Sequence, residues 1–204
     1  MMTAQDLSAK LHAQLRLATK AAHHRLDHHP LLAPLLREDL SATQYGDALA
    51  SLHGVHAVIE TRLLAFLAAN PGLFDYAARR KVAAIDADLR ALHRSPLPVS
   101  ISLPTPDSVG ALVGLLYTLE GATQGGQYIA RNLHQLPPPQ LPSTFFDGYG
   151  AHTAARWQEF WDFAQANCPS AEHTLAISSA TAMFEAIGQH LDACLVLLKK
   201  TEPD

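Results

Sequence analysis

The sequence predicts an all-α protein. Apolar side chains recur at the three- and four-residue spacing of a helix through nearly all of the 204 residues. No alternation of apolar and polar residues lasts long enough to build a β-sheet. Prolines and glycines cluster in a few short segments, which divide the helical pattern into pieces. Because no linker separates two cores, we expect residues 1–204 to form a single helical domain.

The first two helices have sequence signals at their ends. A helix over residues 4–29 stops at Pro30, which cannot continue it, and residues 31–36 form a short helical turn. The next helix opens with the capping box Ser41-Ala-Thr-Gln44 and runs to about residue 70, just before a Pro-Gly pair.

The remaining helices are separated by two proline-rich loops, over residues 95–106 and 137–142. The helical segments that we expect around these loops are residues 74–93, a glycine-interrupted helix over 107–133, a helix that carries Trp157, Phe160, Trp161 and Phe163, and a last helix over 170–199.

Composition narrows the possible classes of function. The net charge of −4 argues against a nucleic-acid partner, because proteins that bind the phosphate backbone are usually basic. The two cysteines, Cys168 and Cys194, lie far apart without metal-binding spacing and indicate free thiols in a reducing compartment. We see neither a signal-peptide pattern nor a run of about 18 uncharged apolar residues. We therefore expect a cytoplasmic protein with no membrane partner.

One face of the first helix carries an unusual column of polar side chains. At about 100° per residue, Arg16, Lys20, His23 and Asp27 fall within an arc of roughly 60°. An apolar stripe that can face the core lies beside them and comprises Leu7, Leu11, Ala18, Ala22 and Leu26. A surface histidine and a solvated charged face are the ordinary explanations for each residue alone. Together they suit a flat, anionic, metal-containing ligand such as heme, with the imidazole for iron and the cations for carboxylates.

A second unusual segment is rich in glycine. Three glycines, Gly121, Gly125 and Gly126, lie within six positions of a helix, where each costs up to about 1 kcal/mol relative to alanine. Close helix packing is one explanation, since Gly110 and Gly114 continue small residues along the same side. The other is that a flat ligand approaches the helix backbone closely. The glycines alone leave both explanations open.

Together the two segments resemble the heme oxygenase family, in particular its compact bacterial branch. The stretch Leu17-Ala-Thr-Lys-Ala-Ala-His-His-Arg-Leu26 is similar to the family's proximal helix, and Leu116-Tyr-Thr-Leu-Glu-Gly-Ala-Thr-Gln-Gly-Gly126 is similar to its distal helix. Weaker matches are Tyr149-Gly150 followed by Trp157-Gln-Glu-Phe160, and Met183-Phe184 in the last helix. The matching pieces extend over about residues 10–197.

This resemblance implies a helical bundle that holds heme between a proximal N-terminal helix and a glycine-kinked distal helix. It implies that His23 binds the iron and that Arg16 and Lys20 hold the propionates. The other implied heme contacts are Tyr117, Gly121, Gly125 and Gly126, with catalytic roles for Gly121, Gly125 and Gln127.

The implied reaction uses heme as both cofactor and substrate. Dioxygen and electrons from a ferredoxin or reductase would convert heme to biliverdin, carbon monoxide and ferrous iron. The basic run Arg79-Arg80-Lys81 is a conceivable docking patch for that donor, although a solvated helix face is the commoner explanation for such a run.

The chain departs from the mammalian pattern at one position. Ala122 stands where an aspartate organises the distal water. The proton relay therefore remains open among Thr123, Gln124, Gln127 and a chain of water molecules.

Other functions compete with this interpretation. A non-catalytic heme carrier or sensor of the same fold would keep His23 and the cations. A diiron oxidase could use His56, Glu60, Glu120 and Glu185, but no Glu-x-x-His pair occurs. A thiamin-degrading enzyme would need a reactive cysteine, and a helical interaction protein would leave the column on the first helix unexplained.

Overall fold

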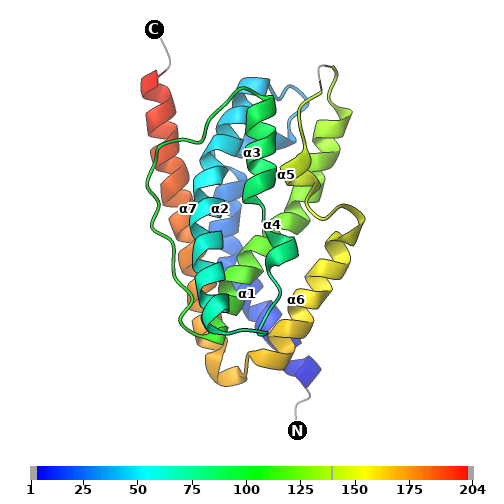
Figure 1. Cartoon of the computed structure of the whole chain (residues 1–204), viewed down its shortest axis with the longest axis vertical. Coiled ribbons are helices and arrows are strands. Elements are labelled where there is room, and N and C mark those ends of the chain that lie inside the picture. The colour runs from blue at the N-terminus through cyan, green and yellow to red at the C-terminus, as the bar shows by residue number, and fades with distance from the viewer. Residues whose placement is uncertain (1–3, 139, 202–204) are drawn as a thin grey trace.

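A computed structural model describes residues 4–138 and 140–201, and it describes side-chain surroundings from residue 10 onward. All regular elements in this part of the chain are helical, so the all-α prediction is confirmed. Seven α-helices form an elongated bundle, with the N-terminus at one end and the C-terminus at the other (Figure 1). They are α1 (Ala4–Asp27), α2 (Ala42–Ala69), α3 (Val82–Ala91), α4 (Val109–Gln135), α5 (Thr144–Asp147), α6 (Thr153–Asn167) and α7 (His173–Thr201).

Two helices begin at serine caps that lie next to them in the sequence. The Ser41 hydroxyl accepts the Gln44 backbone N–H at 3.2 Å, and the Gln44 side chain accepts the Ser41 N–H at 3.1 Å. This is the predicted capping box of α2. Ser108 caps α4 with its hydroxyl alone, which accepts the Ala111 N–H at 3.1 Å. Helix α4 is continuous through all its glycines, so they make room by lacking a side chain, without breaking the helix.

The predicted helix over 74–93 is wrong in its first half. Residues 77–79 form a short 3₁₀ turn, and α3 begins only at Val82. The cause lies far away in the sequence, because the carboxylate of Glu60 on α2 accepts the backbone N–H groups of Lys81 and Val82. A buried acceptor at this point satisfies the first free donors of α3 and fixes its start.

Helix α5 was not predicted at all, and its start is set by another distant carboxylate. Asp88 of α3 accepts the backbone N–H groups of Thr144 and Phe145 at 3.1 and 2.8 Å. Neither of these capping carboxylates lies near its helix start in the sequence, so no local pattern reports them.

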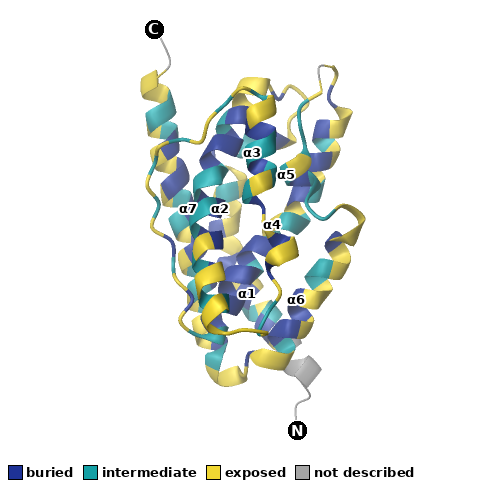
Figure 2. Ribbon diagram, in the orientation of Figure 1, coloured by how far each residue is buried: buried dark blue, intermediate teal, exposed yellow. Residues whose placement is uncertain are grey.

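Helix α4 forms the centre of the bundle (Figure 2). Its Leu112, Val113, Leu115 and Leu116 are completely buried, and it packs along much of α7. A second apolar cluster joins α2 to α3 and α5 and includes Tyr45, Leu49, Ile85 and Leu89. The loop between α3 and α4 runs down the outside of the bundle (Figure 1). By length and composition, α2 and α7 could each cross a membrane, but both contribute to the core, as helices of water-soluble proteins also do.

Candidate functional site

The predicted column on α1 exists, and its histidine is held by the predicted aspartate. His23 Nδ1 lies 2.8 Å from Asp27 Oδ2, and both side chains are more than half exposed. The His23 ring packs against Phe184 of α7, with centroids 5.8 Å apart. Because Asp27 occupies Nδ1, the remaining ring nitrogen, Nε2, is the one available to a metal.

Arg16 and Lys20 are exposed on the same side of α1. Neither forms an ion pair within the described residues, so both cations are available to a ligand. We call the side of α1 that carries Arg16, Lys20, His23 and Asp27 the histidine face. In the apolar stripe beside it, Leu11 and Ala22 are buried and Leu26 is half-buried, but Ala18 is exposed, and Leu15 and Thr19 are buried in its place. The side chain of Leu7 lies outside the described residues.

The glycines of α4 divide into two groups with different surroundings. A Cβ at Gly114 would overlap the Ala176 carbonyl of α7, and one at Gly110 would lie 2.6 Å from the Glu172 carbonyl oxygen. By contrast, a Cβ at Gly121 or Gly125 would meet no atom within 4 Å. The packing explanation therefore holds for Gly110 and Gly114, while the second pair leaves open space beside the backbone. We call the side of α4 that carries Gly121 and Gly125 the glycine face.

The other predicted distal residues have different surroundings. Gly126 lies against Phe146, which a Cβ there would approach to 3.6 Å. Gln127 donates from its amide to the Asp147 carbonyl at 3.1 Å, and Gln124 donates to the Thr153 carbonyl at 3.1 Å. These two amides tie α4 to the end of α5 and to the start of α6.

Helices α1 and α4 meet through an aromatic cluster that we call the aromatic wall, formed by His12, Tyr117, Trp157 and Trp161. Tyr117 lies one turn before Gly121 on α4, and His12 lies one turn before Arg16 on α1. Their ring centroids are 6.4 Å apart. The contact brings the histidine face and the glycine face to the same side of the bundle.

The basic run at residues 79–81 is neither a docking patch nor a solvated face, so both sequence interpretations were wrong. Arg79 is 2% exposed and pairs with Glu120 of α4 at 2.8 Å and with Glu159 of α6 at 3.0 Å. The Lys81 ammonium lies 3.5 Å from the centre of the Tyr149 ring, and only Arg80 is exposed. Tyr149 in turn donates to Glu120 at 3.1 Å.

Two of the carboxylates that a diiron site would need are already engaged in other contacts. Glu120 is neutralised by Arg79, and Glu60 accepts backbone N–H groups at the start of α3. The described residues contain no group of three side chains that could hold a metal ion. The buried network is formed by Glu60, Arg79, Lys81, Glu120 and Tyr149. No sequence signal points to it, because its members come from four separate segments of the chain.

Burial shifts the pKa of several groups around the network. Desolvation, together with the charge of Lys81, lowers the pKa of His56 to about 3. Desolvation lowers the pKa of Lys81 to about 8, although Glu120 and Glu60 oppose that shift. Desolvation raises the pKa of Glu120, which its contacts with Arg79 oppose.

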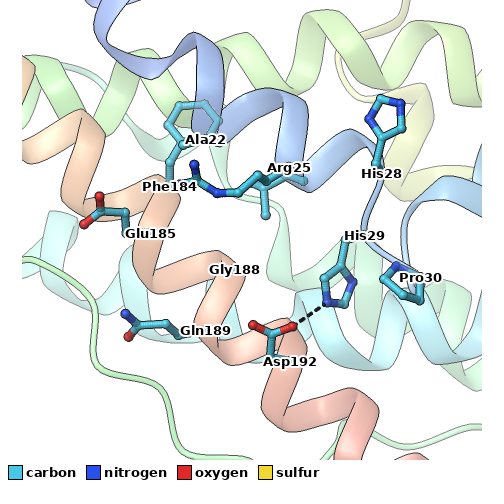
Figure 3. Close-up of a pocket in the computed structure, with 11 residues that line it drawn as sticks. Ala22, Arg25, His28, His29, Pro30, Phe184, Glu185, Gly188, Gln189 and Asp192 are labelled. Atoms are coloured by element: carbon cyan, nitrogen blue, oxygen red, sulfur yellow. Dashed lines mark hydrogen bonds and ion pairs between the residues drawn. The ribbon is translucent and has the colours of Figure 1, made fainter.

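A surface groove lies between the end of α1 and α7 (Figure 3). Arg25, His28 and His29 line one side, and Gln189 and Asp192 line the other. His29 is buried, accepts the Leu31 N–H at 3.2 Å and contacts Asp192 at 3.3 Å, so its two nitrogens hold the chain after α1. The groove adjoins the histidine face, because Phe184, which also lines the groove, packs against the His23 ring.

Comparison with known proteins points to one family. The model of the Heme oxygenase family matches residues 9–95. A heme oxygenase of Xanthomonas campestris pv. campestris (strain 8004) is 31% identical over 158 residues, covering 76% of this chain and 91% of that protein.

Two solved structures share the fold. Heme oxygenase from Leptospira interrogans has a TM-score of 0.68 at 14% identity, covering 90% of this chain and 98% of that one. Heme oxygenase-1 from the cyanobacterium Synechocystis sp. PCC6803, in complex with heme, has a TM-score of 0.67 at 18% identity, covering 93% and 94%. These matches favour the enzyme over a non-catalytic carrier of the same fold. The chain belongs to the heme oxygenase family and is an oxygenase that degrades heme.

Proposed function

We propose that heme is bound and degraded between the histidine face of α1 and the glycine face of α4, with His23 Nε2 as the iron ligand. The observation that carries this proposal is the pairing of two features. An imidazole oriented by Asp27 leaves one nitrogen free, and Gly121 and Gly125 leave open space beside their backbone. A flat ligand that contains a metal needs both a nitrogen to bind the metal and room to approach the opposite helix.

The residues present suit heme on three counts. His23 offers a nitrogen ligand whose tautomer Asp27 sets through Nδ1. Arg16 and Lys20 offer cations to the propionates. Tyr117, Gly121 and Gly125 form the opposing surface, whereas Gly126, which the sequence also predicts as a heme contact, is buried against Phe146. When bound, heme supplies the oxygen chemistry that yields biliverdin, carbon monoxide and ferrous iron, while the protein supplies ligation and orientation.

On the distal side we assign Gly121 and Gly125 to close approach and Gln127 to holding α4 in place. The amides of Gln124 and Gln127 already donate to backbone carbonyls, and the Thr123 hydroxyl donates to the Leu119 carbonyl at 3.1 Å. Ala122 is exposed. We therefore assign proton delivery to water molecules ordered beside Ala122, in place of a side-chain acid.

The complete proposal includes a setting for the enzyme. Residues 1–204 act as one catalytic domain in the cytoplasm, and a ferredoxin or a reductase supplies the electrons. Because Arg79 and Lys81 are buried, the run at residues 79–81 is not the docking surface for this donor.

The test is heme titration of the purified protein, followed by reductant in air. We expect the Soret band of heme to shift on binding and a bilin spectrum to appear after reduction. His23→Ala should remove the histidine-ligated spectrum, while the matched variant His24→Ala, on the neighbouring exposed residue, should keep it. A Soret band that does not shift from its position in free heme would refute the site. A Soret band that persists unchanged in His23→Ala would refute the ligand.

A further inference from the structure

Four histidines lie at the end of α1, and the structure uses them differently. His23 contacts Asp27 through Nδ1 at 2.8 Å. His29 is buried, and both of its ring nitrogens contact other residues. His24 and His28 are exposed and take no part in the proposed heme site. These two imidazoles are therefore left without an assigned role.

The His28 ring is oriented by the backbone of its own helix. Its Nδ1 atom lies 2.8 Å from the carbonyl oxygen of His24. A carbonyl oxygen only accepts hydrogen bonds, so Nδ1 of the neutral ring carries the proton and Nε2 keeps a free lone pair. Histidines that bind metals commonly donate one ring N–H to a carbonyl in this way, which leaves the other nitrogen to the ion. The Nε2 atom of His28 is therefore ready to bind a metal.

The His24 ring lies directly beside the His28 ring. Residues four apart on a helix are neighbours on its surface, and these two rings stack with centroids 4.2 Å apart and planes inclined by 23°. Among the residues that the structure describes, neither ring nitrogen of His24 has a hydrogen-bond partner. Imidazole nitrogens bind metals at about 2.0–2.1 Å, so two that share an ion lie about 3 Å apart. A small tilt of the two rings toward each other brings their nitrogens to that separation.

The surroundings of the two rings suit a cation. Helix α1 ends at Asp27, so its last carbonyl groups, which carry partial negative charge, lie beside the pair. The Asp27 carboxylate adds a negative charge on the same turn. The Arg25 side chain points toward Phe184 of α7, away from the His28 ring (Figure 3). Because both rings are exposed, water has access to the remaining positions around a bound ion.

From these contacts we propose that His24 and His28 form a binding site for a divalent transition-metal ion, separate from the heme iron. Imidazole nitrogen suits Cu²⁺, Ni²⁺ and Zn²⁺, whereas Mg²⁺ and Ca²⁺ prefer oxygen ligands. Among these ions, affinity for a given site is highest for Cu²⁺. The pair lies about 100° around α1 from His23, so its nitrogens do not point where the proposed iron ligand points. An ion held by both rings links two consecutive turns at the end of α1.

The test is titration of the untagged, heme-free protein with Cu²⁺, followed by electron paramagnetic resonance. We expect one tightly bound ion per chain, with nitrogen hyperfine splitting from two imidazoles. His24→Ala and His28→Ala should each weaken Cu²⁺ binding by about tenfold or more, because a single imidazole remains. The matched control is His152→Ala, which removes another exposed histidine that caps no helix and should leave the affinity unchanged. His23→Ala should also retain the Cu²⁺ signal.

Two results would overturn the metal site. One is an unchanged Cu²⁺ affinity in both His24→Ala and His28→Ala. The other is loss of the Cu²⁺ signal in His23→Ala with its retention in His24→Ala, because the ion would then occupy the proposed iron ligand. Should one of the pair variants fail to fold by circular dichroism, the other decides by the same measurement. Since the titration uses no heme, a failure of the proposed heme site leaves this result unaffected.

Discussion

The two glycine pairs of α4 allow one substitution to be tested in two surroundings. Glycine to alanine in a helix interior stabilises the helix by about 1 kcal/mol when nothing obstructs the new methyl group. At Gly121 a Cβ has no neighbour within 4 Å. We therefore expect Gly121→Ala to raise the free energy of unfolding of the heme-free protein by about 1 kcal/mol, which corresponds to about 2–4 °C in Tm for a chain of this size.

Gly114→Ala should have the opposite effect. The new Cβ would overlap the Ala176 carbonyl of α7, a backbone atom that cannot move aside as a flexible side chain would. Overpacking of this kind costs about 1–3 kcal/mol or more, which exceeds the helix gain. We expect a Tm lowered by several degrees, measured by circular dichroism or calorimetry without heme.

Heme affinity completes this pair of predictions. Gly121→Leu places a large side chain in the space proposed for heme, so heme titration should show at least a tenfold loss of affinity while the heme-free protein stays folded. Equal destabilisation by Gly121→Ala and Gly114→Ala would show that both glycines serve helix packing. Undiminished heme binding by Gly121→Leu would show that heme lies elsewhere. Either result would refute the division of α4 into a packed half and an open half.

Three further predictions concern titrating groups. His56 is buried and has a pKa of about 3, whereas a histidine in the unfolded chain has a pKa of about 6.5. Between pH 6.5 and 3 only the unfolded chain binds this proton, so acidification through this range should lower the free energy of unfolding by up to about 5 kcal/mol. His56→Met should remove that share of the acid dependence, whereas the core control Ile59→Val should not. Lys81 has a pKa of about 8 in the folded protein, below the ordinary value of 10.5, so between these two pH values only the unfolded chain holds the proton. The free energy of unfolding should therefore rise by up to about 3 kcal/mol from pH 8 to 10.5. Lys81→Met should flatten this rise when unfolding by urea is measured at each pH. Asp27→Asn keeps the size of the side chain but removes the negative charge beside His23 Nδ1, so the reduction potential of the bound iron should rise in a spectroelectrochemical titration; an unchanged potential would mean that the contact does not act on the iron.

The sequence by itself determined the features that depend on local spacing. Helical periodicity is a property of neighbouring residues, so the all-α class and the α2 capping box could be predicted. The same holds for the contact of His23 with Asp27, because residues four apart on a helix lie side by side whatever the rest of the chain does. Local spacing was therefore enough to predict the histidine face.

Only the tertiary structure decided what distant segments do to one another. A run of three cations at residues 79–81 looks solvated in sequence, but Glu120 and Tyr149 come from elsewhere and bury Arg79 and Lys81. The start of α3 depends on Glu60 in the same way. The glycines of α4 are indistinguishable in sequence, and only the approach of α7 at Gly114 separates packing from open space. Burial, charge pairing and steric contact are set by residues far apart in the chain, so periodicity cannot report them.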